Sequence, residues 1–515
     1  MSTFAGQGLP FSLAIAAAGS IPFLLVYFVL RRPSTIRNIP GPPSQSWIFG
    51  NTQQLILSTQ YGDYEFGWLK SYGPVYRLRN CFGVRSVKLH VKFGGLIPAK
   101  QDRLMVADPA ALSFIINSPH FKASPMLENV VYLLHGPKSL IYVSAEEHKP
   151  LRAALNVGFT AAAVRNYQSI FEKAAARITE KLDNSPSTVD ICPLLSFATL
   201  STIGEAVMAA SASQSRLQIL AEAIASHLPP WLFRAVAHLP TPDFKTARDA
   251  KRLAYELGNR IVREKLLAAR EGQLDTDGDV FSVLCATKDG LPGDIVAAQT
   301  SLFMVAGQET TATTLVLGLR ELARLPNFQA DLRSEITAHT GKVAYDSMPL
   351  LNAFIKECLR MFPVVPIDDR IAREDAVIPL SEKITLSTGE EISQICIEKG
   401  QIVSVAIASF QRLESRWGED AHEFNPNRWL HGTAYKGPEA EALGPYANLF
   451  FGGPHTCLGW RFAVLEMQVF ICELVRQFSF ALPEDDAVRI RLAFSLHPMM
   501  PNGQKGAPMI VSRIS

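Results

Sequence analysis

The residues with the clearest chemical potential lie near the C-terminus, where a cysteine follows aromatic residues and glycines. The run from Phe450 to Gly459 reads FFGGPHTCLG, and the apolar spacing after it predicts a helix over 462–480. Cys457 therefore precedes a helix, where unpaired N–H groups and the helix dipole favour a thiolate. Glycines beside it let the backbone approach a flat ligand. A lone cysteine is usually an inert small hydrophobic residue, but this frame of Phe, Gly, Pro and His favours a metal ligand.

A second motif, AGQETT, lies within the apolar segment 293–325, which predicts a buried helix of about 50 Å. Phe303, Ala306, Gly307 and Thr310 share one face of that helix. A glycine costs about 1 kcal/mol against alanine there, which indicates a need for space. One interpretation is ordinary packing, with the threonine bonded back to a carbonyl. The other is a groove that leaves room for dioxygen.

Two further motifs contain charged residues. Glu357 and Arg360 form an E-x-x-R pair that Pro363 then ends, and Arg428 lies in the sequence FNPNRW. As an isolated pair, residues three positions apart contribute only a few tenths of a kcal/mol and are common by chance. The pair therefore indicates a function only together with the other motifs of the chain.

In these motifs the chain resembles the cytochrome P-450 family. The family's ligand loop, F-x-x-G-x-R/H-x-C-x-G, matches at Phe450, Gly453, His455, Cys457 and Gly459. The resemblance implies that Cys457 is the axial thiolate ligand of the iron in haem b (iron protoporphyrin IX), and thiolate ligation favours O–O cleavage. His455 stands where the family more often has arginine and is expected to contact a propionate.

The resemblance also assigns roles to the other motifs. The pattern A-G-x-D/E-T-T occurs whole, so Thr310 is expected to be the oxygen-site alcohol and Glu309 its acidic neighbour. Glu357, Arg360 and Arg428 are expected to form a buried charged triad that is expensive to break. We assign this triad to structure and not to catalysis.

Further cations suit the propionates. His148 and Arg152 lie four residues apart and resemble the family's W/H-x-x-x-R helix, and Arg370 resembles the arginine after the E-x-x-R helix, with Arg373 as its competitor. A guanidinium forks onto a carboxylate. For each cation alone, a solvated surface charge is the commoner case.

The elements that must position these residues are mostly helical. Helical spacing occurs over 145–155, 164–182, 217–224 and 247–268, and strand-like sequence is confined to 74–106 and 373–406. We therefore predict a mainly α chain with a small β region, the cytochrome P-450 fold around a buried haem. Residues 84–100 fit the family poorly, and are either a real insertion or a translated intron.

The first thirty residues carry no charge, and the apolar run 9–30 is long enough, at roughly 33 Å, to span a bilayer. A cleaved signal peptide would have a basic start, and a core helix would show a polar stripe. We predict a transmembrane anchor over 1–31, a Pro-rich hinge over 32–50 and a haem-thiolate catalytic domain over 51–515. Arg31 and Arg32 predict a cytosolic domain on a single-pass protein of the endoplasmic reticulum membrane.

The composition argues against a nucleic-acid-binding protein and against a disulfide-rich one. The 50 basic and 48 acidic residues give a net charge of +2, which provides no footprint for nucleic acid. Seven cysteines, an odd number without any C-x-x-C, argue against a disulfide framework and for a reducing compartment.

The expected function is NADPH- and O2-dependent oxidation of an apolar substrate, resembling fungal members of the family that act on terpenoids in secondary metabolism. A membrane-bound flavoprotein reductase is the expected electron donor, with cytochrome b5 as a further one. Two alternatives are a haem-thiolate isomerase or dehydratase that needs no reductase, and a haem carrier or sensor without turnover. Expected substrate contacts are the 126–140 loop, Phe303, Ala306, Thr311, Val364, Val365 and residues 494–496, and the 228–233 loop is expected to touch the bilayer.

Overall fold

The computed structural model of the chain describes residues 34–46, 49–80, 102–143, 145–203, 230–271, 280–286, 291–339, 344–430 and 449–514. The helices in these ranges are α2 (Thr52–Ile56), α3 (Glu65–Tyr72), α4 (Pro109–Asn117), α5 (Pro125–Leu134), α6 (Ala145–Leu155), α7 (Ala161–Asn166), α8 (Gln168–Asp183), α9 (Ile191–Ile203), α11 (Pro230–Val236), α12 (Pro242–Arg270), α13 (Val280–Ala286), α14 (Gly293–Arg324), α15 (Pro326–Ala338), α16 (Pro349–Met361), α17 (Ile407–Phe410), α18 (Glu414–Trp417) and α20 (Trp460–Gln477).

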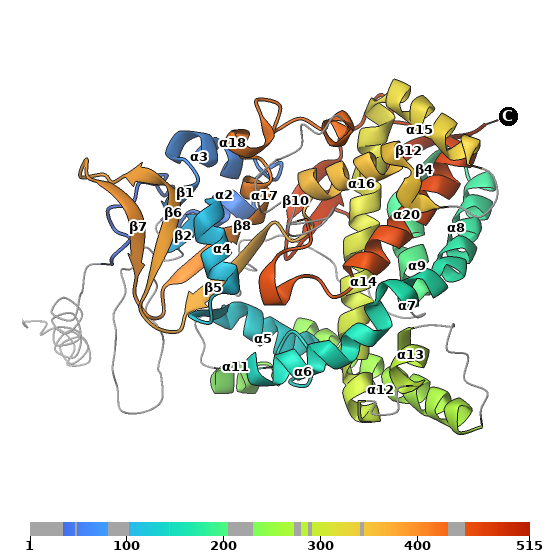
Figure 1. Ribbon diagram of the computed structural model, residues 1–515, viewed down its shortest axis with the longest axis horizontal. Helices are drawn as coiled ribbons and strands as arrows, with labels where there is room; N and C mark the ends of the chain where they lie inside the picture. Colours follow the sequence, from blue (N-terminus) through green and yellow to red (C-terminus); the bar gives the residue numbers. More distant parts are fainter. Residues whose placement is uncertain are drawn as a thin grey trace, which may run out of the picture.

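The strands in the same ranges fall into four sheets. They are β1 (Val75–Leu78), β2 (Arg103–Val106), β3 (Phe121–Ala123), β4 (Thr188–Asp190), β5 (Ile367–Ala372), β6 (Ala376–Thr385), β7 (Glu391–Ile397), β8 (Ile402–Ala406), β9 (Phe478–Ala481), β10 (Arg489–Leu492), β11 (Leu496–Met499) and β12 (Pro508–Arg513). Strands β1, β2 and β5–β8 gather at one end of the molecule, and α8, α9, α14, α15, α16 and α20 lie at the other (Figure 1). The predicted mainly α fold with a small β region is confirmed.

Helix α14 is the central element of the helical end. It packs against α9, α12, α16 and α20, and every residue from Thr311 to Arg320 is buried. Its predicted bounds, 293–325, agree with the structure. A long segment with few charged residues must be buried on all sides, so its ends are easy to recognise in the sequence. Helix α20, just after Cys457, shares the same hydrophobic core through residues such as Phe462 and Phe470.

The largest sheet has the strand order β1-β2-β8-β5-β3. Strand β2 runs parallel to β8, with Leu104 opposite Val403, and the other neighbours are antiparallel. The second hydrophobic core lies at this sheet. Residues 36 and 39 are buried in it, and the Arg77 N–H donates to the Pro40 carbonyl at 2.9 Å. The described part of the predicted hinge thus packs on the catalytic domain.

The structure corrects several predicted elements. The expected 126–140 loop contains helix α5, whose first turn is capped by the Ser124 hydroxyl, an acceptor from the Leu127 N–H. The predicted helix over 164–182 is two helices, α7 and α8, and the prediction for 247–268 is only the middle of α12. Strands β3, β4, β5 and β9–β12 were not predicted, because they lie outside the strand-like regions 74–106 and 373–406.

Three predictions concern segments outside the described residues: the anchor over 1–31, the 217–224 helix and the doubtful 84–100 segment. Within the ranges that the structure does describe, no helix has both the length and the apolar character needed to cross a bilayer.

Candidate active site

The loop that carries Cys457 is fixed by backbone contacts. The Cys457 N–H donates to the Phe450 carbonyl at 3.0 Å, which closes the loop on itself. Gly453 has a φ of +59°, and a Cβ there would come within 2.5 Å of Asn117 Oδ1 on α4, so only glycine fits. Phe451 also has a positive φ, 65°, which is strained for a side chain of this size. This tight loop presents Cys457 just before α20.

The Cys457 side chain is enclosed by protein and yet accessible. Burial, the largest effect, raises the pKa of its thiol, although the Gly459 backbone N–H and the Arg152 charge act to lower it. Its surface is nevertheless exposed. Because burial favours the neutral thiol, a thiolate at this position requires a metal ion or another positive partner.

The predicted basic side chains converge beside this thiol. Arg152 Nη2 donates to the Thr456 carbonyl at 2.5 Å, and the rings of His148 and His455 lie 4.9 Å apart. Burial, followed by the charges of Arg370, His148 and Arg152, lowers the pKa of His455 to about 4. His455 is therefore neutral at pH 7 and offers a ring N–H, not a charge.

Arg370, and not its competitor Arg373, belongs to this cluster. Its guanidinium carbon lies 5.3 Å from the centre of the Phe451 ring in the Cys457 loop, whereas Arg373 is exposed. Arg370 Nε also donates to Asp368 Oδ2 at 2.5 Å. That bond uses Nε, and among the described residues the two Nη groups have no second carboxylate.

These residues fit a haem. Its two propionates are carboxylates, and the structure gathers Arg152, Arg370, His148 and His455 beside the Cys457 loop. Among the described residues, Asp368 is the carboxylate that pairs with Arg370. Such an excess of donors is costly without anionic ligands. Soft thiolate and paired guanidiniums together are the donor set expected for an iron porphyrin with propionates.

On α14, the AGQETT segment interrupts an otherwise covered helix. Val305 is 49% exposed and Ala306 is exposed, although Met304 and the residues after Thr310 are buried. The Thr310 hydroxyl donates to the Ala306 carbonyl at 2.6 Å, so its lone pairs remain available as acceptors. Ala306 is thus uncovered and Gly307 partly so, and the groove for dioxygen on this face stays a prediction.

The helix and the Cys457 loop are joined through one aromatic residue. Phe159 contacts the Phe303 ring, with centroids 5.5 Å apart, and a Cβ on Gly459 would lie 3.8 Å from the Phe159 ring. Phe303 packs between Phe159 and Phe281. Thr311 is buried in the core. The burial of Thr311 does not support its predicted contact with substrate, whereas Phe303 is only partly buried and its contact with substrate stays a prediction.

Glu309 has two partners that the sequence motifs did not reveal. Lys505 Nζ donates to Glu309 Oε1, and His497 Nδ1 lies 3.1 Å from the same oxygen. Burial acts to raise the pKa of Glu309, but the His497 contact and the Lys505 charge outweigh it and lower this pKa to about 2. Glu309 is therefore a carboxylate at neutral pH.

The other expected substrate segments meet each other. The Leu496 N–H donates to the Val364 carbonyl at 2.8 Å, which joins the turn before β11 to the chain after α16. Val365 is 41% and Phe494 59% exposed. Accessible apolar side chains at the joined segments suit an apolar ligand.

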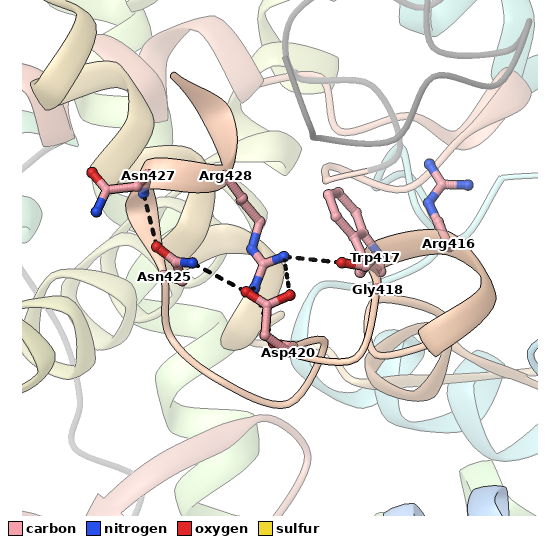
Figure 2. Close-up of a pocket in the computed structure, with 7 residues that line it drawn as sticks. All are labelled: Arg416, Trp417, Gly418, Asp420, Asn425, Asn427 and Arg428. Atoms are coloured by element: carbon pink, nitrogen blue, oxygen red, sulfur yellow. Dashed lines mark hydrogen bonds and ion pairs between the residues drawn. The ribbon is translucent and has the colours of Figure 1, made fainter. Parts of the chain in front are cut away.

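The predicted structural triad is confirmed. Glu357 Oε1 accepts from Arg360 Nη2 at 2.7 Å and from Arg428 Nε at 3.1 Å, and all three side chains are almost completely buried. Arg428 also pairs with Asp420, whose second contact is the amide of Asn425, in the pocket that Figure 2 shows. Every one of these contacts lies within the protein, so the triad has no capacity left for a ligand.

Comparison with known proteins agrees with this site. The sequence model described as Cytochrome P450 matches residues 40–503, so the chain belongs to the cytochrome P450 family. Cytochrome P450 monooxygenase 81 of Postia placenta is 29% identical, with 93% of each chain aligned. The ganoderic acid synthetase CYP5150L8 of Ganoderma lucidum is 27% identical over 92% of each chain. Cytochrome P450 monooxygenase claQ of Ampulloclitocybe clavipes is 26% identical over 86% of each chain. The chain is thus an oxidoreductase of the cytochrome P450 monooxygenase type.

Proposed function

We propose that this protein hydroxylates an apolar substrate with O2 and with electrons from NADPH, using haem b ligated by Cys457. His148, Arg152, Arg370 and His455 would hold the propionates. When bound, the haem supplies reduction and cleavage of dioxygen, and the thiolate favours that cleavage.

The observation that carries the proposal is the accessible face of α14 with an intact acid and alcohol. The Thr310 hydroxyl proton is committed to the Ala306 carbonyl at 2.6 Å. Thr310 therefore acts as a hydrogen-bond acceptor, which can hold a proton-carrying water in place without releasing a proton itself. Glu309, a carboxylate paired with Lys505, can accept a hydrogen bond from a water molecule that brings a proton from solvent. An isomerase, a carrier or a sensor requires neither function.

Accessible Val305, Val365 and Phe494 support an apolar substrate. Two relatives are named for fungal monooxygenases and a third for ganoderic acid synthesis. We take a terpenoid of fungal secondary metabolism as the first substrate class to test.

We further propose a location at the endoplasmic reticulum membrane, with the 1–31 anchor, a cytosolic catalytic domain, an NADPH-dependent flavoprotein reductase and cytochrome b5 as partners. In α11, Trp231 is 59% exposed, which supports a second contact with the bilayer, whereas Phe233 is buried and cannot take part. Residues 228 and 229 of the predicted contact lie outside the described residues.

The test uses microsomes that contain the full chain and a reductase. We expect reduced wild type to give the red-shifted carbon-monoxide band of a thiolate haem, and Cys457→Ser to fold without it, because a hydroxyl is a harder and weaker donor to iron. Cys396→Ser is the matched control, since Cys396 is exposed on β7. A band that survives in Cys457→Ser would assign the ligand to another cysteine.

The same microsomes separate the alternatives. Oxygenated product that appears only with NADPH supports the monooxygenase. Product formed equally without NADPH would favour the isomerase or dehydratase, and a haem protein that turns over no member of a broad terpenoid panel would favour the carrier or sensor.

A further inference from the structure

We propose that His497 is a positioning residue for Glu309, held in place by Ser495, and that it links the acid on α14 to the turn that carries Phe494. The proposal rests on the proposed monooxygenase function and adds residues to its proton-delivery site.

The first part of the argument is the contact with Glu309. His497 lies in β11 and Lys505 between β11 and β12, and both reach Glu309 Oε1. Among the described residues, no basic side chain pairs with Oε2 in this way. With Oε1 fixed by two groups, the carboxylate has one orientation, and Oε2 is the oxygen left to bind water.

The second part is the direction of the hydrogen bonds. An ionised carboxylate only accepts, so the proton of His497 belongs on Nδ1, which lies 3.1 Å from Oε1. Nε2 is then the acceptor, and it lies 3.1 Å from Ser495 Oγ, which donates its proton. Ser495, His497 and Glu309 thus form one row of polar contacts. The contact between Ser495 Oγ and Nε2 is a hydrogen bond, and the one between Nδ1 and Oε1 is a short electrostatic contact without hydrogen-bond alignment.

The third part is the location of Ser495. Its carbonyl accepts from the Ala493 N–H at 2.9 Å, which closes a tight turn around the exposed Phe494. The next residue, Leu496, bonds to Val364. A ligand that displaces Phe494 would therefore also move Ser495 Oγ, which donates to His497. Through His497 it would change the orientation of the Glu309 carboxylate.

The four side chains in this cluster differ in their exposure to solvent. Ser495 is 8% exposed, and the His497 side chain is 12% exposed, compared with 31% for Glu309 and 29% for Lys505. Glu309 and Lys505 are in contact with solvent, whereas the imidazole of His497 is shielded from it. A shielded imidazole between a turn and an acid suits positioning more than proton exchange.

Two isosteric variants separate the two contacts of His497. The amide nitrogen of asparagine can replace Nδ1, so His497→Asn keeps the donor to Glu309 and loses the contact with Ser495. The amide nitrogen of glutamine can replace Nε2, so His497→Gln keeps a polar group near Ser495 and loses the donor to Glu309. Each variant is made alone and with Glu309→Gln.

The first measurement is thermal unfolding, which does not depend on turnover. We expect His497→Gln to lower Tm in the wild-type background and to leave it unchanged in the Glu309→Gln background, because the partner is already altered. Equal Tm losses in both backgrounds would overturn the proposal.

The second measurement is product formed per NADPH consumed, with the carbon-monoxide band as a check that the Cys457 site is intact. We expect His497→Gln to lower this ratio roughly tenfold and His497→Asn to lower it much less. Equal ratios for the two variants would overturn the positioning role alone. A wild type without NADPH-dependent product would instead overturn the proposed function.

Discussion

Glu357 on α16 and Glu309 on α14 both pair with two basic groups, but the two clusters differ in every other respect. Glu357 has no exposed surface and is bonded through both carboxylate oxygens, to Arg360, Arg428 and the indole N–H of Trp429. Glu309 is about one-third exposed and is held through one oxygen only.

This difference indicates a structural role for the Glu357 cluster and a chemical role for the Glu309 cluster. A buried charge with every hydrogen-bonding position filled stabilises one arrangement of the chain, and removing one member leaves the others uncompensated. A partly exposed acid with one oxygen free can change its partners at small cost. The E-x-x-R cluster is therefore a fixed support, and the Glu309 cluster can work with water and protons.

The largest effect is expected at the support. Glu357→Gln should destabilise the fold by about 3–5 kcal/mol, because Arg360 and Arg428 lose their shared counter-charge in a buried position. Urea unfolding and the yield of haem-containing protein measure it.

Asp249 provides the matched control for Glu357. It pairs with Arg252 at the same three-residue spacing in α12, with both side chains well exposed. Asp249→Asn should change stability by less than about 0.5 kcal/mol. A Glu357→Gln protein as stable as this control would show that the buried cluster contributes no more than a surface pair.

An intermediate effect is expected at Thr310. Thr310→Ala removes the hydroxyl acceptor on the accessible face, so NADPH should still be consumed while electrons leave as hydrogen peroxide. Product should fall at least tenfold, equivalent to about 1.4 kcal/mol in the productive barrier.

Thr314 is the control for Thr310, one turn further along α14. Its hydroxyl makes the same kind of bond, to the Thr310 carbonyl at 2.9 Å, but it is buried in the core. Thr314→Ala should keep its product yield per NADPH. If Thr310→Ala also kept full yield, the assignment of the oxygen-side alcohol would be wrong.

The smallest effect concerns acid stability. The pKa of Glu309 is lowered from 4.5 to about 2 in the folded protein. A depressed pKa stabilises the fold fully above pH 4.5, and this contribution is lost as the pH falls towards 2. The Tm advantage of wild type over Glu309→Gln should therefore be constant from pH 7 to about 5 and shrink below that. An advantage that grew on acidification would contradict the ion pair.

The sequence predicted residues that lie in short motifs, and missed residues whose contacts join segments far apart in the chain. Cys457, Thr310 and the E-x-x-R pair lie in short motifs at fixed spacing, and α14 is defined by its apolar length. Helix α5 carried a local signal that was overlooked: an N-cap serine, a proline at the first helical position and an acidic residue, Glu128, in the first turn.

Other features had no local signal at all. His497 and Lys505 reach Glu309 from the C-terminal strands, and only the folded chain brings them together. Strands β9–β12 are short, and their pairing partners lie on distant segments, so their sequences alone give no alternation long enough to detect. Arg370 could be separated from Arg373 only by its place over the Phe451 ring.

The mixed order of the large sheet has a consequence for biosynthesis. Strand β2 pairs with β8, and beside this pairing the Gln401 amide donates to the Asp102 carbonyl across 299 residues of chain. At roughly 5–20 residues per second, β2 waits for its partner for roughly 15–60 seconds of translation. During that time one edge of β2 is unpaired and able to join another chain. Nascent copies on one polysome thus compete with the late strand for that edge. Fewer ribosomes on each message, or capture of the nascent chain by a chaperone, should therefore raise the yield of active protein.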